Sequence, residues 1–428
     1  MVIEASYSKV NITPPIGLRL GGYAHRLGKP SNRIHDDLYA RLLMMTNGET
    51  EVIIIQVDLL GLYSSDASLI RRSVSKVTGV KEDNIIIAST HTHSAPETVI
   101  PMWPNTIPYS EEERAKYSEW FNGMVNKLAE AASKLNGTER VELRIGVGEA
   151  SGLCFNRSFK GGLTGSELPI LLVKFNGGKV ALANYPCHPV CNTDLGISAD
   201  YPGVAYDVLL SSGVELMFLT GATGDIDPIR KGRGYMNYLG YSLSSSIIEA
   251  LNSLKPTASV IEVKGIKVNL PLRTVNQEGA RLRYEEALSR VKAKGGLPNE
   301  PTESIWADED YLKLMYSDEE YEVSKDNRRI IESEVDLVRI GGLLMVTIPG
   351  EPFIESALRI SNIAENAGFR VTMVVGYAND YVGYIPIKAS FIRGTYEARL
   401  ARWSRVTEDA EGLIIRSVEA NLGEIAIH

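Results

Sequence analysis

Two isoleucine-rich runs constrain the fold of this 428-residue chain more than any other feature. EVIIIQV at 51–57 and NIIIAS at 84–89 are apolar at nearly every position, which is typical of strands buried on both faces of a sheet. Residues 65–77 between them have helical periodicity, and Ser65 and Asp66 suit the N-terminus of a helix. This succession favours a layered α/β architecture.

The same alternation continues along the rest of the chain without an internal repeat or a low-complexity linker. We predict a helix at 110–136 and further strands at 140–148, 169–175, 178–185, 215–221 and 335–351. Residues of about 275–330 are charged and mostly helical in pattern, and we expect them to form an excursion over the site or an interaction surface. The fold class is therefore mixed α/β (α+β), with layered mixed sheets flanked by helices and one domain spanning 1–428.

The charge of the chain limits its partners. A formal net charge of −8 argues against nucleic acid, since phosphate binding needs clustered cations. Only Arg230, Lys231 and Arg233 form a locally basic stretch, which is either a solvated loop or a contact for an anionic substrate group. No apolar run approaches the roughly 18 residues that a membrane span needs.

Several features of the sequence predict a cytoplasmic protein. The N-terminus has neither a basic start nor an apolar run, so we expect no secretory signal. The cysteines Cys154, Cys187 and Cys191 are too few for a disulfide framework, which agrees with a reducing compartment. Abundant Glu, Lys, Arg, Ile and Tyr are typical of a thermophile. The sequence does not determine the oligomeric state, and a homo-oligomer is compatible with it.

The placement of the six histidines is informative. His91 and His93 follow the strand at 84–89 and are separated by one residue, so both imidazoles point to one side and can serve a single cation. A pair of hydrogen-bonded loop histidines is the alternative. His188 lies in Tyr-Pro-Cys-His-Pro, where two prolines restrict the backbone. It is either a metal ligand or a core histidine, and the flanking Cys187 and Cys191 also allow a thiolate zinc site.

Carboxylates follow two further predicted strands. Asp225 and Asp227 in GDIDP can bind a cation, orient water or act as a base, or they can stabilise a turn. Glu351 stands between two prolines after an apolar strand, where a carboxylate is costly unless it meets a cation or hydrogen-bond donors. Because ligands bind at the carboxyl ends of strands in open α/β sheets, we expect these groups to converge there. The cluster YANDYVGY at 377–384 is by itself compatible with a surface loop.

Five of these segments, in this order, resemble motifs of the neutral ceramidase catalytic domain. They are THTHSAP, CFNRS at 154–158, HPVCNTDLGISADYPG, RIGGLLMVTIPGE, and GYANDYVGY followed by TYEA at 395–398. The resemblance implies one zinc ion bound by His91, His188, Glu351 and Tyr384. It also implies that His93 donates to the substrate carbonyl or moves a proton, that Arg157 binds a polar or anionic part of the substrate, and that Tyr381 lies close by.

Two departures from the family shape the expected function. Asp227 stands where the family has a serine in Gly-Asp-Val-Ser-Pro-Asn, so either metal-bound water attacks directly or Asp227 acts as a base or an extra ligand. Only 44 residues follow Tyr384, so we expect the family's C-terminal immunoglobulin-like domain to be missing. We therefore predict a zinc-dependent amide hydrolase with His93, Asp225, Asp227 and Arg157 as catalytic residues, acting on a small molecule other than ceramide. The alternatives are a metal-dependent esterase or lactonase, and a non-catalytic metal- or ligand-binding protein.

Overall fold

Three large β-sheets surround a common apolar core in the computed structural model, which describes residues 2–426. In the order of the strands, the first sheet consists of β5 (Ile85–Ser89), β4 (Glu51–Val57), β3 (Tyr39–Thr46), β1 (Glu4–Asn11) and β6 (Glu139–Arg140). The second consists of β12 (Glu215–Thr220), β10 (Lys179–Tyr185), β9 (Glu167–Lys174), β7 (Glu142–Glu149) and β14 (Lys255–Pro256). The third consists of β15 (Ile261–Pro271), β16 (Ile330–Ile340), β17 (Leu343–Thr347) and β19 (Val371–Val375).

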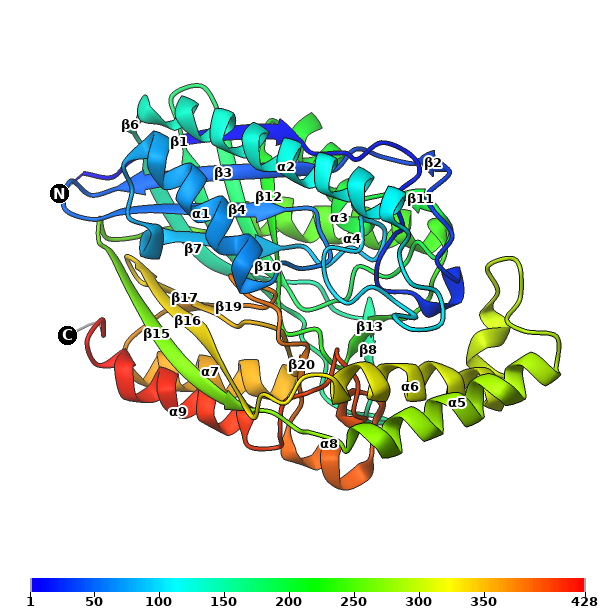
Figure 1. Ribbon diagram of the computed structural model, residues 1–428. Coiled ribbons are helices and arrows are strands. Elements are labelled where there is room, and N and C mark those ends of the chain that lie inside the picture. The colour runs from blue at the N-terminus through cyan, green and yellow to red at the C-terminus, as the bar shows by residue number, and fades with distance from the viewer. Residues whose placement is uncertain (1, 427–428) are drawn as a thin grey trace.

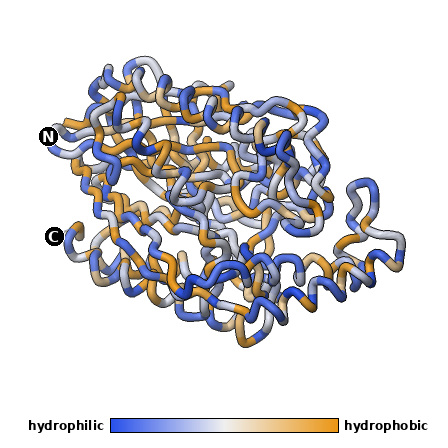
Figure 2. The backbone as a smooth tube through the Cα atoms, in the orientation of Figure 1, coloured by the Kyte–Doolittle hydropathy of each residue, from blue (hydrophilic) through white to orange (hydrophobic). Residues whose placement is uncertain are grey.

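Both faces of the central strands are buried, which explains their continuous apolar sequences. Each sheet sends side chains into the common core, among them Ile54, Leu182 and Met345. Their neighbours Ile53 and Leu344 point the opposite way, because successive side chains of a strand alternate between faces. In Figure 2 the hydrophobic colour follows these strands.

Helices cover the outer face of each sheet (Figure 1). The first sheet carries α1 (Ser64–Thr78) and α2 (Glu111–Ser133), and the second carries α3 (Tyr201–Ser211) and α4 (Arg233–Leu251). The third carries α7 (Ile354–Asn366) and α9 (Ala410–Leu422). The predicted mixed α/β class is thus confirmed, with each sheet lying between the common core and a pair of helices.

Each large sheet contains one parallel pair of strands: β4 with β5, β10 with β12, and β17 with β19. Their carboxyl ends lead into the segments that carry His91, His188, Asp225 and Glu351. A short parallel pair, β18 (Glu351–Pro352) and β20 (Tyr384–Ile385), sets Glu351 opposite Tyr384. Three sheets therefore deliver polar side chains to one region.

The start of α1 differs from the prediction. Its N-cap residue is Tyr63, with no side-chain cap, so the expected cap by Ser65 and Asp66 is wrong. Instead the Ser64 N–H donates to Asp380 Oδ1 at 2.8 Å, across 316 positions of the sequence. A residue distant in sequence thus accepts from a free N–H group at the start of the helix, where a nearby side chain often does so.

The segment of about 275–330 forms a helical hairpin of α5 (Gln277–Ala293) and α6 (Glu309–Ser324), joined through a 3-10 turn at Glu303–Trp306 (Figure 1). Apolar side chains of this hairpin pack into one cluster with Tyr381, Tyr384 and Trp403. The hairpin therefore contacts the region where the strand ends converge. Among residues 2–426, none of the helices combines the length and the apolar character that a bilayer-spanning segment requires.

A disulfide joins Cys154, at the start of β8 (Cys154–Asn156), to Cys187, with the two Cα atoms 6.3 Å apart. This disulfide runs against the reducing compartment expected from the small number of cysteines. The two residues are 33 positions apart, and only the fold brings them together. Cys187 is therefore not available as a zinc thiolate, and Cys191 remains a buried free thiol.

We expect the Cys154→Ser substitution to lower the free energy of unfolding by about 3 to 4 kcal/mol, because it releases a loop of this length in the unfolded chain. Urea unfolding with and without dithiothreitol measures the effect. Dithiothreitol should destabilise the wild-type protein and leave the variant unchanged. Three reactive thiols in the denatured but unreduced wild-type protein would contradict the disulfide.

Candidate metal centre

His91 is held with one ring nitrogen facing the interior of the site. Its backbone is in the left-handed region, with φ of 64°, and its N–H donates to the Leu59 carbonyl at 2.8 Å. Such a backbone conformation is costly for a side chain other than glycine and persists only where its surroundings fix it. Nδ1 lies 2.6 Å from the Leu60 carbonyl oxygen, which can only accept. Nδ1 therefore carries the proton, and Nε2 presents its lone pair.

His188 follows β10 and presents the same nitrogen to the same region. Its backbone N–H donates to the Ile226 carbonyl, and Nδ1 lies 3.3 Å from that oxygen and 3.6 Å from Asp227 Oδ1. Both neighbours of Nδ1 are acceptors, so a proton on Nδ1 satisfies that side of the ring and leaves the Nε2 lone pair for a cation. Nε2 lies 3.1 Å from Glu351 Oε2.

Glu351 is buried at the meeting point of the two imidazoles. Oε2 is 3.5 Å from His91 Nε2 and accepts a hydrogen bond from the Tyr377 hydroxyl at 3.1 Å. Oε1 accepts from the Tyr381 hydroxyl at 2.5 Å. Burial alone raises the pKa of Glu351, but His91, His188 and Tyr381 outweigh it and lower the pKa to about 2. The side chain is therefore a carboxylate at neutral pH.

His93 completes a cluster of three imidazoles. Its Nε2 is 3.1 Å from His91 Nε2, and the ligand nitrogens of His91, His93 and His188 all lie within 4.8 Å of one another. Burial lowers the pKa of His93 well below its usual value, so the ring is neutral. Gly22 packs against this ring, where a Cβ atom would lie 2.2 Å from Nδ1. Within residues 2–426 that Nδ1 has no hydrogen-bond partner.

These groups fit a divalent cation. The Nε2 lone pairs of His91 and His188 face a carboxylate, an arrangement of acceptors that only a shared proton or a cation stabilises. The backbone carbonyls bound to the opposite ring nitrogens fix the tautomers, as they do for metal-ligating histidines. Imidazole and carboxylate donors suit zinc and the related transition metals.

A small cavity of about 50 Å³ opens next to this cluster. The polar residues of its lining include His91, His93, Glu351 and Tyr384. Its other walls are largely apolar and aromatic: Gly22, Leu60, Ile100, Met102, Trp306, Tyr381, Tyr396 and Trp403. Trp306 belongs to the 3-10 turn of the helical hairpin, so the excursion predicted from the sequence contributes to the wall of the cavity.

Arg157 links the groups behind the cavity. Its guanidinium donates to Tyr384 Oη at 2.8 Å, to Asp227 Oδ1 at 2.9 Å and to Glu397 Oε1 at 2.9 Å. A fourth bond reaches the Gly224 carbonyl oxygen at 2.8 Å. Arg157 does not line the cavity, so most of its donors serve neighbouring side chains of the protein.

The two aspartates of GDIDP lie in different environments. Asp227 is on the Nδ1 side of His188, away from Glu351, and although burial opposes its ionisation, Arg157 and His188 lower its pKa. Asp225 is fully buried, and its carboxylate accepts from Asn156 Nδ2 at 2.6 Å and from the Ile354 N–H at 2.9 Å. Burial raises the pKa of Asp225 to about 7. Neither residue lines the cavity.

The tertiary structure adds residues to the site that sequence reasoning did not select. The Tyr377 ring stacks on His91, with ring centroids 4.0 Å apart, and its hydroxyl is hydrogen-bonded to Thr223. Glu397 is 1% exposed and pairs with Arg157. Tyr377 and Glu397 both lie in the quoted motifs GYANDYVGY and TYEA, which was the only signal available for them. The basic stretch at 230–233 has exposed cations, in agreement with a solvated loop.

Comparisons with known proteins point to one group. No family model matches the chain. The neutral ceramidase of Mycobacterium tuberculosis is 36% identical over 66 residues, which is 15% of this chain and 10% of that protein's own length. The crystal structure of neutral ceramidase from Pseudomonas aeruginosa aligns with 100% of this chain and 75% of its own, with a TM-score of 0.73 and 19% identity. A ceramidase complexed with C2 aligns with a TM-score of 0.72 and 16% identity, over 100% of this chain and 76% of its own.

Fold and site together define a mixed α/β protein with a polar centre, able to hold a metal ion, at the carboxyl ends of strands from three sheets. Over its whole described length, this architecture is the fold of the neutral ceramidases.

Proposed function

We propose that this protein is a zinc-dependent hydrolase of a small-molecule amide. The observation that carries the proposal is the convergence of the His91 and His188 lone pairs on the Glu351 carboxylate beside a small cavity. His91, His188, Glu351 and Tyr384 are the proposed ligands. A zinc ion held by these residues would polarise a carbonyl group and lower the pKa of bound water toward neutrality.

The remaining residues take roles that follow from their contacts. His93 is neutral and borders the cavity, so its ring can donate to the substrate carbonyl or move a proton to the leaving amine. Arg157 donates to the Tyr384 hydroxyl and so orients it; burial raises the pKa of this hydroxyl well above its usual value, and the positive charge of Arg157 opposes that shift. Tyr381 borders the cavity and donates to Glu351, which keeps that carboxylate in place beside the substrate. Asp225 is a positioning residue, because its carboxylate holds Asn156 and the start of α7.

The proposed role of Asp227 is to orient His188. It does not act as the nucleophile. Its carboxylate accepts from Arg157 and lies 3.6 Å from Nδ1 of His188, so its negative charge favours the tautomer of His188 that has its proton on Nδ1. A carboxylate cannot replace a serine hydroxyl as nucleophile without changing the intermediate. The proposed attack is therefore by water, and the proposed substrate is a smaller amide than ceramide.

Elemental analysis and a substrate panel test the proposal. The purified protein is assayed for bound zinc and for turnover of matched amides, esters and lactones, with and without a chelator. Chelator-sensitive hydrolysis of amides is the expected result. Turnover confined to esters and lactones supports the esterase alternative, which uses the same polarised carbonyl with a better leaving group. Metal binding without turnover of any substrate overturns the hydrolase assignment.

For Asp227→Ser we expect turnover to fall about 10- to 100-fold, which is the usual effect of removing a group that orients a metal ligand. Asp227→Asn is the matched variant, because it keeps the size of the side chain and removes its charge. Steady-state kinetics on the best amide, together with zinc content, provides the measurement. If both variants retain full turnover and full zinc content, Asp227 does not orient His188.

A further inference from the structure

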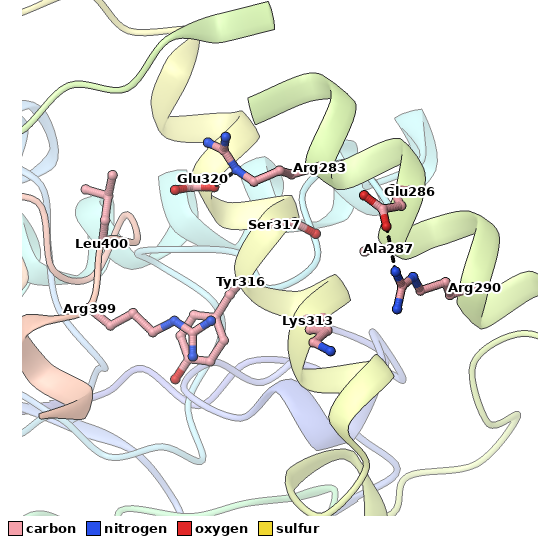
Figure 3. A pocket seen from close by; sticks show the side chains of 10 residues that line it. All are labelled: Arg283, Glu286, Ala287, Arg290, Lys313, Tyr316, Ser317, Glu320, Arg399 and Leu400. Carbon is pink, nitrogen blue, oxygen red and sulfur yellow. Dashed lines mark hydrogen bonds and ion pairs between the residues drawn. The ribbon is translucent and has the colours of Figure 1, made fainter. Parts of the chain in front are cut away.

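A second, larger pocket lies on the helical hairpin, outside the candidate metal centre (Figure 3). It has a volume of about 360 Å³ and is formed by α5, α6 and the segment that follows Tyr396. The residues that line it are Arg283, Glu286, Ala287, Arg290, Lys313, Tyr316, Ser317, Glu320, Arg399 and Leu400. Four of these side chains are cationic and two are carboxylates, although the chain as a whole carries a charge of −8.

Ion pairs within the pocket neutralise only part of this positive charge. Arg283 pairs with Glu320 at 2.8 Å, and Arg290 pairs with Glu286 at 2.6 Å. Both carboxylates of the lining are thereby used. Lys313 pairs with a carboxylate outside the lining, Glu309, in an exposed pair of the kind that contributes little.

Arg399 is the fourth cation of the lining, and it takes part in none of these ion pairs. Within residues 2–426 no carboxylate lies within ion-pair distance of it, and its guanidinium carbon is 3.3 Å from the centroid of the Tyr316 ring. Figure 3 shows this guanidinium lying against the ring at one end of the pocket. Stacking on an aromatic face fixes the plane of the guanidinium and leaves its N–H groups free to bind an anion at two points.

The rest of the lining is suited to an apolar stem. Ala287, Leu400 and the Tyr316 ring contribute apolar surface to the lining. A free inorganic anion cannot bury this apolar surface. An anionic group on a short alkyl chain covers it, and the burial of apolar surface then adds to the binding free energy. The lining therefore matches an amphiphilic anion.

The pocket is close to the metal centre in both sequence and space. The Tyr316 ring lies 6.5 Å, centroid to centroid, from Trp403, which lines the small cavity. Arg399 is two residues after Glu397, whose carboxylate binds Arg157. One ring of the pocket lining and one ring of the cavity lining are thus neighbours.

We infer that this pocket binds a carboxylate or phosphate group on an apolar stem, and that the substrate amide bears such a group several bonds from its scissile carbonyl. The second half of this inference rests on the proposed function, whereas the anion site stands on its own lining. Arg399 supplies the main contact to the anion, and Lys313, whose partner Glu309 lies outside the lining, adds to the positive potential of the pocket.

Calorimetric titration tests the anion site without turnover. Octanoate, octyl phosphate and the neutral octanamide are titrated into the wild-type protein, Arg399→Ala and Arg281→Ala. Arg281 lies on α5, which contributes to the pocket, but it is not part of the lining. It carries the same charge as Arg399 and is paired with Glu278 and Glu285, which makes it the matched control. We expect an anion to bind about tenfold more tightly than octanamide, a preference lost in Arg399→Ala and kept in Arg281→Ala.

The outcomes separate the two proposals. Tighter binding of octanoate identifies a carboxylate group, and tighter binding of octyl phosphate identifies a phosphate group. Equal affinity for the three probes, or equal loss in both variants, overturns the anion site even if neutral amides are hydrolysed. In kinetics, an amide ending in a carboxylate or phosphate should have a KM about tenfold below that of its neutral counterpart, and Arg399→Ala should abolish the difference. Anion binding without turnover of any amide retains the pocket and overturns the proposed hydrolase.

Discussion

Replacing His188 with alanine is expected to abolish zinc binding and to lower amide hydrolysis about a thousandfold or more, because the metal contributes several kcal/mol to stabilising the transition state. His188 is fully buried, and its Nε2 faces Glu351 while its Nδ1 is held by the Ile226 carbonyl. The alanine leaves the Glu351 carboxylate with one imidazole fewer around it. Elemental analysis and steady-state kinetics on the same preparation measure both effects.

The control for this prediction is His35→Gln. His35 is bound to Asp194 and Arg233, outside the three-histidine cluster, so zinc content and turnover should stay at the wild-type level. His91→Ala should behave like His188→Ala, since both residues present Nε2 to Glu351. Undiminished zinc in both alanine variants would remove these histidines from the proposed set of ligands.

Arg157→Ala is expected to lower the free energy of unfolding by about 3 to 5 kcal/mol, which is the usual cost of leaving a buried charge without its partner. The Glu397 side chain is 1% exposed and that of Asp227 is 12% exposed, and both lose their ion pair. Tyr384 loses the donor that holds its hydroxyl. Urea unfolding followed by circular dichroism measures the change in stability.

A second substitution separates lost charge pairing from lost packing. In Arg157→Ala, the added change Glu397→Gln removes one of the stranded carboxylates, so it should restore part of the stability. Arg281→Ala, in which an exposed arginine of α5 is removed, should change stability by no more than about 0.5 kcal/mol. If Arg157→Ala is as stable as Arg281→Ala, the buried network does not stabilise the fold as its contacts indicate.

The central strands could be predicted closely because their signal is local. The run at 51–57 coincides with β4, and the run at 84–89 contains β5, since a strand buried on both faces must be apolar at successive positions. Helix and strand positions around 110–136 and 169–185 followed from periodicity in the same way. The start of α1 was assigned a local cap that it does not use, because Asp380 satisfies its first N–H group.

Which chemical groups follow the strands can be predicted from the order of residues alone, because His91, His188 and Glu351 each come shortly after an apolar run. The folded protein was needed to show that these groups meet, that Tyr377 and Glu397 belong with them, and that Cys154 pairs with Cys187. The physical reason is that periodicity records whether a residue is buried, whereas contacts between three separate sheets depend on how the sheets pack. The side of each imidazole that faces the centre was likewise fixed by carbonyl groups of Leu60 and Ile226, which no pattern of side chains reveals.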